Sequence, residues 1–335
     1  MSAENQNQAS SLTALVQNDT PIVLDGALAT YLESKGADIS SALWSAELLI
    51  SNPDLIYQAH LDYYRAGANV VTTASYQASF EGLQKHAGLT EKDAIALVKK
   101  SVELAFRARD DYLKELDEEQ KKKREGRLFV AGSVGPYGAF LADGSEYRGD
   151  YTLPKNQMQN FHRGRIRALV EAGVDVLAIE TIPSYPETEA LIDLLEEEGY
   201  NVPVWFSWTL KSEDSLSDGS RLIDASNYVT SCGRVNVIAM GVNCISETLA
   251  LKSLGYLSHT PSLPIVVYPN SGELWDAEKR FWHGKKTEGV ELKQLVVNYW
   301  KNGGGLIGGC CRTTPDDIKV IAEALQAFEP VQKRS

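Results

Sequence analysis

Val174-Asp175-Val176-Leu177-Ala178-Ile179-Glu180 is a largely apolar run of strand length that ends on a carboxylate. A stretch with helical periodicity, residues 154–173, precedes it and ends on Ala172-Gly173, a sequence typical of a helix C-cap. A shorter helical stretch, residues 186–199, follows it. Apolar runs without alternation suit parallel strands that are buried on both faces. This segment therefore predicts a strand between two helices.

The same alternation of a β-rich run and an amphipathic stretch occurs along the whole chain. The other seven runs are residues 21–25, 68–73, 127–133, 202–208, 235–244, 263–268 and 305–309. Repeated strand–helix alternation predicts an α/β fold with a parallel sheet, and eight repeats favour a closed TIM-type (β/α)8 barrel over a doubly wound open sheet. We expect a single barrel domain over residues 12–327, with polar tails at residues 1–11 and 328–335.

Composition and charge restrict the partners of this protein. The 335 residues include 33 basic and 45 acidic side chains, a net charge of −12, which argues against binding to nucleic acid or to an anionic membrane. The first 20 residues lack the basic start and apolar core of a signal peptide, and no apolar run approaches the ~18–20 residues of a membrane span. Four cysteines without a framework pattern fit a reducing compartment. We expect a cytoplasmic protein.

Three of the four cysteines follow strand-like runs. Cys244 closes one run, and the adjacent pair Cys310-Cys311 closes the last. This placement predicts a three-thiolate metal site with one open coordination position. Two alternatives remain open: a redox-active vicinal disulfide, and cysteines that pack as small apolar side chains. A vicinal disulfide would be strained, because successive Cα atoms lie ~3.8 Å apart and relaxed disulfides need roughly 4.4–6.8 Å. The fourth cysteine, Cys232, is expected to pack.

Two neighbouring residues can bind one metal only if the backbone between them is irregular. Adjacent strand residues point to opposite faces of a sheet. Gly308 and Gly309, directly before the cysteine pair, permit such an irregular backbone.

The carboxyl ends of the predicted strands carry most of the chemically reactive side chains. In a barrel of this kind these ends form the active-site face. Two carboxylates, Asp25 and Glu180, are expected there together with the three thiols. The remaining strand ends contribute polar and aromatic residues: Thr73, Ser133, Trp208, Tyr268 and Asn270.

The ligand set limits the chemistry of the expected metal. None of the five histidines lies near the cysteines or in a pattern typical of zinc hydrolases, which makes a hydrolase the weaker alternative. Three thiolates leave zinc a poor acid for water activation but suit the binding and deprotonation of one more thiol. The bound sulfur would remain electron-rich and could attack a soft electrophile such as a sulfonium methyl group.

A long segment after the third strand, residues 136–150, interrupts the minimal repeat. Long loops in compact domains are usually functional lids or disordered. Three aromatic residues of this segment, Tyr137, Phe140 and Tyr147, favour a lid or a ligand wall.

Taken together, these motifs resemble those of the homocysteine S-methyltransferases over residues 12–327. The resemblance lies in residues 24–30 (LDGALAT), 132–139 (GSVGPYGA), 142–147 (ADGSEY), 180–183 (ETIP), 241–244 (GVNC), 268–273 (YPNSGE) and 308–312 (GGCCR). It implies a (β/α)8 barrel with Zn²⁺ on Cys244, Cys310 and Cys311, and homocysteine thiolate in the open position.

By motif position, the resemblance also implies substrate-binding roles for Asp25, Gly26, Glu180 and Asn243. Asp25 and Glu180 match the carboxylates that hold the homocysteine ammonium group, which offers three donors. We expect Tyr137, Phe140 and Tyr147 to help enclose the methyl donor, because aromatic faces can hold an onium group.

The motifs in the lid resemble the branch of the family that uses S-methylmethionine or S-adenosylmethionine. A betaine-dependent methyltransferase and a non-catalytic zinc or thiol redox protein are the alternatives. The partners expected are small molecules, L-homocysteine and a sulfonium methyl donor. The sequence shows no dimerisation extension, and we expect a monomer.

Overall fold

The computed structural model describes residues 11–41, 43–258, 263–276 and 281–328. The central sheet contains eight strands, and each overlaps one of the eight predicted runs: β1 (Ile22–Val23), β2 (Val70–Thr72), β3 (Phe129–Val134), β4 (Val176–Ile182), β5 (Val204–Trp208), β8 (Val237–Asn243), β9 (Ile265–Tyr268) and β12 (Gly304–Ile307). The predicted tails lie almost entirely outside the described residues.

The eight strands form one closed parallel barrel. Their order is β1-β12-β9-β8-β5-β4-β3-β2, and every pair in it is parallel. A parallel bridge between Leu24 and Val70 joins the two ends of this order. The prediction of a single TIM-type (β/α)8 barrel is therefore confirmed.

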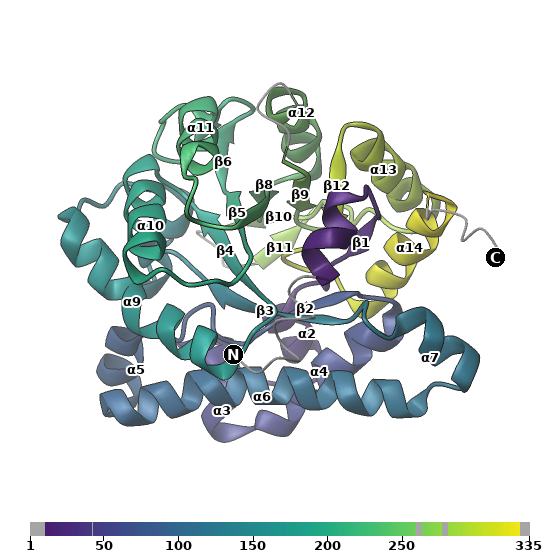
Figure 1. Ribbon diagram of the computed structural model, residues 1–335, viewed down its shortest axis with the longest axis horizontal. Helices are drawn as coiled ribbons and strands as arrows, with labels where there is room; N and C mark the ends of the chain where they lie inside the picture. Colours follow the sequence, from purple (N-terminus) through teal and green to yellow (C-terminus); the bar gives the residue numbers. More distant parts are fainter. Residues whose placement is uncertain (1–10, 42, 259–262, 277–280, 329–335) are drawn as a thin grey trace.

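Helices surround the barrel as an outer layer (Figure 1). They are α2 (Leu28–Ser34), α3 (Ser45–Ser51), α4 (Pro53–Ala66), α5 (Phe80–Ala87), α6 (Glu91–Glu115), α7 (Glu118–Arg124), α8 (Tyr137–Leu141), α9 (Lys155–Ala172), α10 (Tyr185–Glu198), α11 (Leu222–Ser231), α12 (Glu247–Leu257), α13 (Gly289–Lys301) and α14 (Pro315–Leu325), with 3-10 turns η1 (Ser145–Tyr147) and η2 (Gln326–Phe328). Two antiparallel hairpins are inserted, β6 (Leu210–Ser212) with β7 (Ser215–Leu216), and β10 (Leu274–Asp276) with β11 (Phe281–His283).

The helices on either side of β4 begin and end where the sequence predicts. Helix α9 ends at Gly173, which has a φ of 85°, and α10 ends at Gly199, with a φ of 63°. Glycine adopts this left-handed conformation without the steric cost that a Cβ adds. At the start of α10, the Ser184 side chain accepts a hydrogen bond from the backbone N–H of Glu187.

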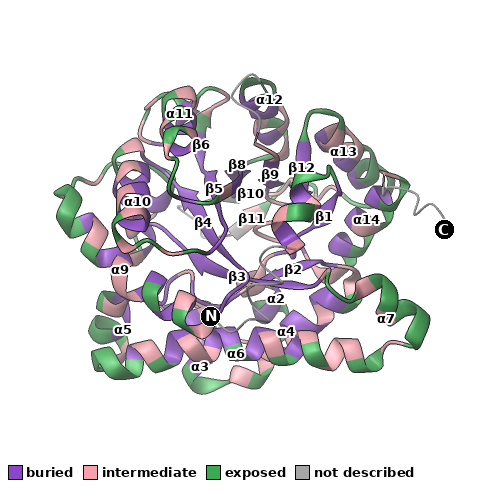
Figure 2. Cartoon of the chain, viewed as in Figure 1, coloured by how far each residue is buried: buried purple, intermediate pink, exposed green. Residues whose placement is uncertain are grey.

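Side chains of each barrel strand alternate between two cores, and Figure 2 shows the barrel strands almost entirely buried. In β4, Val176 and Ala178 face the barrel interior, whereas Leu177 and Ile179 pack against the outer helices. A helix over residues 11–17 adds Leu12 and Val16 to the interior core. The alternation places Glu180 on the inward face, at the carboxyl end of β4.

The long segment after β3 contains more structure than a loop. Helix α8 and the 3-10 turn η1 form within it, and Ala142 between them has a φ of 55°. We refer to residues 137–151 as the lid.

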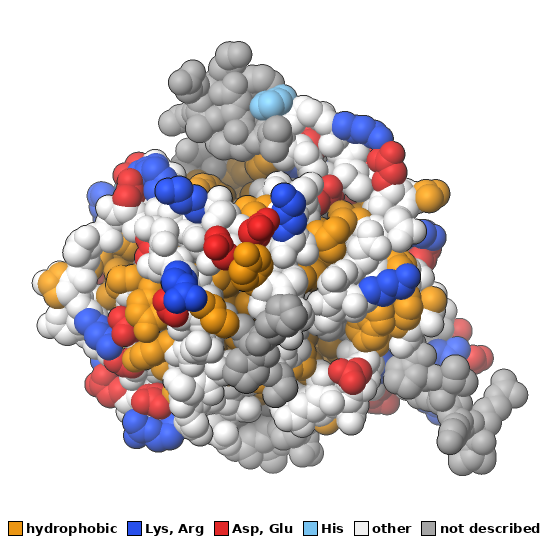
Figure 3. Space-filling model, turned by 90° about the horizontal axis from the view of Figure 1, so that it is seen from above, with side chains coloured by type: hydrophobic (Ala, Val, Ile, Leu, Met, Phe, Trp, Pro, Cys, Tyr) orange, Lys and Arg blue, Asp and Glu red, His pale blue; other side chains and the backbone are white. Residues whose placement is uncertain are grey.

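Charged side chains of both signs lie close together on the α11–α12 side of the molecule (Figure 3).

In the part of the chain that the structure describes, no helix combines the length and the apolar character needed to cross a membrane.

Candidate metal and substrate site

The three predicted cysteine ligands converge at the carboxyl ends of β8 and β12. Their Sγ atoms all lie within 4.8 Å of one another, and those of Cys244 and Cys311 are 3.6 Å apart. Within the described ranges this is the one cluster of His, Cys, Asp or Glu side chains that could hold a metal ion. Three sulfur donors with a remaining position are a ligand set that zinc accepts.

The backbone leaves regular strand geometry at each cysteine. Cys244 has a φ of 55°, and β12 ends at Ile307, before the cysteine pair. The expectation that the two preceding glycines permit this irregular turn agrees with the packing: a Cβ on Gly309 would lie 2.4 Å from Thr313 Oγ1, and one on Gly308 would lie 2.6 Å from Leu24 Cβ. Side chains at these positions would push the turn away from β1.

The segment after β9 is hydrogen-bonded to the cysteine turn and supports it. Cys310 N donates to Pro269 O at 2.7 Å, and Ser271 N donates to Cys311 O at 3.1 Å. Further along, Lys286 pairs with Asp317 at 2.7 Å.

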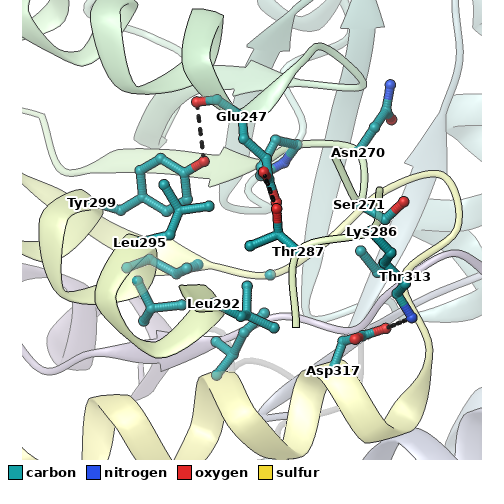
Figure 4. Close-up of a pocket in the computed structure, with 15 residues that line it drawn as sticks. Glu247, Asn270, Ser271, Lys286, Thr287, Leu292, Leu295, Tyr299, Thr313 and Asp317 are labelled. Carbon is teal, nitrogen blue, oxygen red and sulfur yellow. Dashed lines mark hydrogen bonds and ion pairs between the residues drawn. The ribbon is translucent and has the colours of Figure 1, made fainter. Parts of the chain in front are cut away.

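Figure 4 shows a small cavity beside these contacts, with a volume of about 20 Å³ and with Asn270 and Thr313 in its lining. Thr287 Oγ1 donates to Glu247 Oε2 at 2.7 Å across it. This volume suits a single water molecule and is too small for an amino acid, so the cavity is part of the support and not the substrate site.

The three thiols do not share one pKa. Hydrogen bonds from Cys244 and Cys310 hold the pKa of Cys311 well below its usual value, whereas the pKa values of Cys244 and Cys310 are raised. The three thiols therefore titrate as a group, and a cation is needed before all three sulfurs can be ionised together.

The two predicted carboxylates are buried beside this cluster. Asp25 is 4% exposed and accepts hydrogen bonds from Thr72 N at 2.7 Å and Thr72 Oγ1 at 3.0 Å. Glu180 is 8% exposed and accepts a hydrogen bond from the Ser133 hydroxyl. The Tyr268 side chain also lowers the pKa of Glu180, in opposition to burial.

Burial raises the pKa of Asp25 to about 8 and that of Glu180 to about 7. The negative charge of Glu180 also raises the pKa of Asp25, and the negative charge of Cys244 raises the pKa of Glu180. A bound ammonium group would relieve both effects, because an opposite charge favours the ionised carboxylate.

The other two residues expected to bind substrate have structural partners. The Asn243 side chain is fully buried; its Oδ1 accepts from Thr181 N at 2.8 Å, and its Nδ2 donates to Thr181 Oγ1 at 2.8 Å. This pairing fixes Thr181, which has a φ of 60° and follows Glu180 directly. A Cβ on Gly26 would lie 2.8 Å from Thr313 Oγ1, so a glycine lets β1 approach the cysteine turn. Direct contact of either residue with homocysteine stays a prediction.

The three aromatic residues of the lid lie in two different places. The Tyr147 hydroxyl is 3.3 Å from Cys244 Sγ, and the residue is 41% exposed. Tyr137 and Phe140 instead pack on Phe161 of α9, with ring centroids 4.9 Å and 5.6 Å from it. The geometry supports a lid over the cysteines at Tyr147 and an anchor for that lid at the other two rings. Their predicted part in enclosing the donor is not tested by these contacts.

A buried polar network that the sequence analysis missed holds the lid. Glu187 Oε1 accepts from Tyr137 N at 2.7 Å and lies 2.7 Å from His162 Nε2, and its Oε2 accepts from the Tyr151 hydroxyl. Arg165 lies 3.1 Å from His162 Nδ1 and donates to the Gly135 carbonyl at 2.5 Å. Glu187 therefore ties both ends of the lid to α10.

The remaining strand-end residues divide according to strand alternation. Ser207 and Tyr268 face inward, with their hydroxyl oxygens 2.6 Å apart. Trp208 faces outward and donates its Nε1–H to Thr188 Oγ1 at 3.0 Å, so its expected place at the barrel mouth is wrong. Cys232 lies apart from the cluster, packed against the outer core, with its thiol donating to Glu196.

Comparison with known proteins agrees with this geometry. The family model for homocysteine S-methyltransferase matches residues 22–325. A homocysteine S-methyltransferase of Escherichia coli strain K12 is 46% identical over 315 residues, which cover 94% of this chain and 98% of that protein. A selenocysteine methyltransferase of Astragalus bisulcatus is 39% identical over 317 residues, which cover 91% of this chain and 92% of that protein.

The similarity extends to a solved structure. The metallated form of the homocysteine methyltransferase MmuM from Escherichia coli superposes with a TM-score of 0.81 at 45% identity, and the match covers 93% of this chain and 99% of that one. By sequence, by fold and by its three converging cysteines, this chain belongs to the homocysteine S-methyltransferase family.

Proposed function

We propose that this protein transfers a methyl group from a sulfonium donor, S-methylmethionine or S-adenosylmethionine, to the thiol of L-homocysteine, giving methionine. The observation that carries the proposal is the cluster of three cysteine sulfurs within 4.8 Å of one another, next to two buried carboxylates. Thiolates suit the binding of a further thiol, and carboxylates suit the binding of an ammonium group, so the two sets together match one thiol-bearing amino acid.

The residues of this chain hold and orient the acceptor. Cys244, Cys310 and Cys311 would hold zinc, which when bound supplies the positive charge that keeps a fourth thiol deprotonated at neutral pH. Asp25 and Glu180 accept hydrogen bonds from the homocysteine ammonium group. Thr72 and Ser133 fix these carboxylates through the bonds that they donate to them. The acceptor sulfur is thereby held in one orientation at the barrel mouth.

The reaction is a direct displacement at the methyl carbon. A bond forms between the homocysteine sulfur and the methyl carbon while the bond from that carbon to the sulfonium sulfur breaks. The electron pair of the broken bond stays on the donor sulfur, which becomes a neutral thioether, and the thiol proton of homocysteine passes to solvent. Both the negative charge of the nucleophile and the positive charge of the donor decline along this path, so a site with little water favours it.

A zinc or thiol redox protein without methyltransferase activity is the second candidate. It would use the same cysteines, but nothing in such a role employs the buried carboxylates Asp25 and Glu180. The betaine-dependent reaction differs only in the donor.

The three cysteines and both carboxylates come from the same chain, so the acceptor site does not require residues from a second copy, and we propose a monomer. Three sulfurs at such short separations would oxidise readily, which supports a reducing compartment such as the cytoplasm.

A methyl-transfer assay on reduced, zinc-loaded protein tests the proposal. Homocysteine is offered in parallel with S-methylmethionine, S-adenosylmethionine or betaine, and methionine is measured. We expect turnover with at least one sulfonium donor and none with betaine. Absence of methionine with all three donors, from protein with one zinc per chain, would contradict the proposal and favour the redox candidate. Turnover with betaine alone would assign the betaine-dependent reaction.

A further inference from the structure

Glu146 is a buried carboxylate in the lid without a partner of opposite charge. It lies in η1, is 3% exposed, and its Oε2 atom has no hydrogen-bond partner among the described residues. Arg148, two residues along the lid, pairs with Asp150 at 2.8 Å instead. A buried carboxylate oxygen without a hydrogen bond costs free energy, so the retention of Oε2 in this setting calls for a ligand that compensates it.

The charges around Glu146 are mostly of its own sign. Burial raises the pKa of Glu146 to about 7, and Cys244 and Asp143 raise it by charge repulsion, against opposing effects of a hydrogen bond from its own backbone N–H and of Arg148. Its backbone is fixed, because a Cβ on Gly138 would lie 2.5 Å from Glu146 N. The lid thus holds a carboxyl group that ionises near neutral pH and has no cation paired with it among the described residues, so a bound cation would favour its ionised form.

Two tyrosines connect Glu146 to the reacting end of the site. Burial, and with it the charges of Glu146, Cys244 and Glu180, raises the pKa of Tyr76 well above its usual value. The Tyr76 ring stacks on Trp44 with centroids 6.4 Å apart. Tyr147 follows Glu146 directly and places its hydroxyl 3.3 Å from Cys244 Sγ. Aromatic rings and a carboxylate close to one sulfur ligand form a setting that favours a cation.

We propose that Glu146 is the counter-charge for the sulfonium group of the methyl donor and makes this site selective for cationic sulfur donors. The inference rests on the proposed function, in which the sulfonium must come close to the acceptor sulfur beside Cys244. Contact is not required, because charges interact over several ångströms where water is scarce. Glu146 is therefore a specificity-determining residue and not a group that takes part in bond making.

Steady-state kinetics of Glu146→Gln with S-methylmethionine test this inference. Glutamine keeps the shape and removes the charge. We expect the KM for the donor to rise roughly tenfold or more. We also expect kcat to stay the same or increase, because the positive charge that Glu146 stabilises is already fading in the transition state. The KM for homocysteine and the zinc content should not change.

Two further variants separate charge from structure. Glu146→Asp keeps the charge and should recover most of the donor affinity. Asp150→Asn removes an equal charge from the exposed part of the lid and should leave the donor KM at the wild-type value.

Three results would overturn the inference: a donor KM within twofold of wild type in Glu146→Gln, the same rise in Asp150→Asn, or a loss of zinc from Glu146→Gln. A wild-type protein that forms no methionine at all would instead overturn the proposed function, so the two failures can be told apart.

Discussion

The strand-end half of the site and the lid half are built in opposite ways. Cys244, Asp25 and Glu180 lie at the ends of barrel strands, each directly after a residue that is paired in the sheet. The lid has only the short α8 and η1 elements, and its two ends are joined to the barrel through one buried carboxylate, Glu187.

This difference separates the binding of the acceptor from that of the donor. A site on rigid strands suits the homocysteine side, where a metal ligand set and two carboxylates must keep their mutual distances. A segment held by a few polar contacts suits the donor side, since it can open for a ligand and close over it. Changes in the strand ends should therefore remove activity outright, and changes in the lid should act on the donor alone.

The largest expected effect comes from the cysteine cluster. Cys310→Ala or Cys311→Ala should abolish both zinc binding and methyl transfer, because two thiolates no longer complete the ligand set. Metal analysis and the methionine assay measure the two losses. Cys232→Ala is the matched control and should keep both zinc and activity. Full turnover in Cys310→Ala or Cys311→Ala would show that the metal centre is not needed for methyl transfer.

Glu180 tests the acceptor half without touching the metal ligands. Glu180→Gln should raise the KM for homocysteine roughly 10–100-fold, since a hydrogen bond to a charged group contributes about 1.5–3 kcal/mol. Zinc content and the KM for the donor should stay at wild-type values. An equal rise in both KM values would show that the two halves are not independent.

Glu187 tests the lid half in the same way. Glu187→Gln should lower kcat/KM for the donor about fivefold and the free energy of unfolding by about 2 kcal/mol, because a fully buried, charged acceptor of three contacts is lost. Glu189→Gln on the same helix is the control and should have neither effect. If the KM for homocysteine rose as much as that for the donor, the division between the halves would be wrong.

The last effect expected is a loss of stability in acid from two buried histidines, which the raised pKa values of the buried carboxyls Asp25 and Glu180 oppose. Burial lowers the pKa of His162, beneath the lid, and lowers that of His60, on α4, to about 4. A folded-state pKa below the unfolded value of about 6.5 gives stability that is present above pH 6.5 and lost as the pH falls towards the folded value. From pH 7 to pH 5, His60 alone accounts for about 2 kcal/mol.

Thermal unfolding at pH 7 and pH 5 measures this loss, with the two histidines as a matched pair. Relative to wild type, His162→Gln and His60→Gln should both raise the free energy of unfolding at pH 5 compared with that at pH 7, but only His162→Gln should also raise the KM for the donor. A His60→Gln variant with the wild-type difference in unfolding free energy between pH 5 and pH 7 would contradict the prediction.

Much of the acceptor half could be predicted from the sequence. The apolar runs predict all eight strands, and reactive residues at their ends point to the mouth of the barrel. The rule fails for Trp208, because alternation along β5 turns it outward when Ser207 faces inward. A shift of one residue in the register of β5 would exchange its inward and outward side chains, and the sequence of residues 202–208 does not indicate which register forms.

The lid could not be predicted to the same degree. Glu187 follows Ser184 at the start of a helix, a spacing that in the sequence indicates only a helix cap. Its contacts with Tyr137, Tyr151 and His162 depend on how separate segments pack. Glu146 could not be singled out from the sequence either, because only the packing shows that its Oε2 atom is buried without a hydrogen-bond partner among the described residues.

Absorption spectroscopy of the reduced protein loaded with Co²⁺ in place of Zn²⁺ tests whether the homocysteine thiol binds the metal that the three cysteines hold. Homocysteine is added without a methyl donor, so that binding is observed and not turnover. We expect a stronger thiolate-to-cobalt charge-transfer band that saturates at one homocysteine per chain, because the acceptor thiol becomes a fourth ligand beside Cys244, Cys310 and Cys311. An unchanged spectrum at saturating homocysteine, with one cobalt per chain, would contradict it.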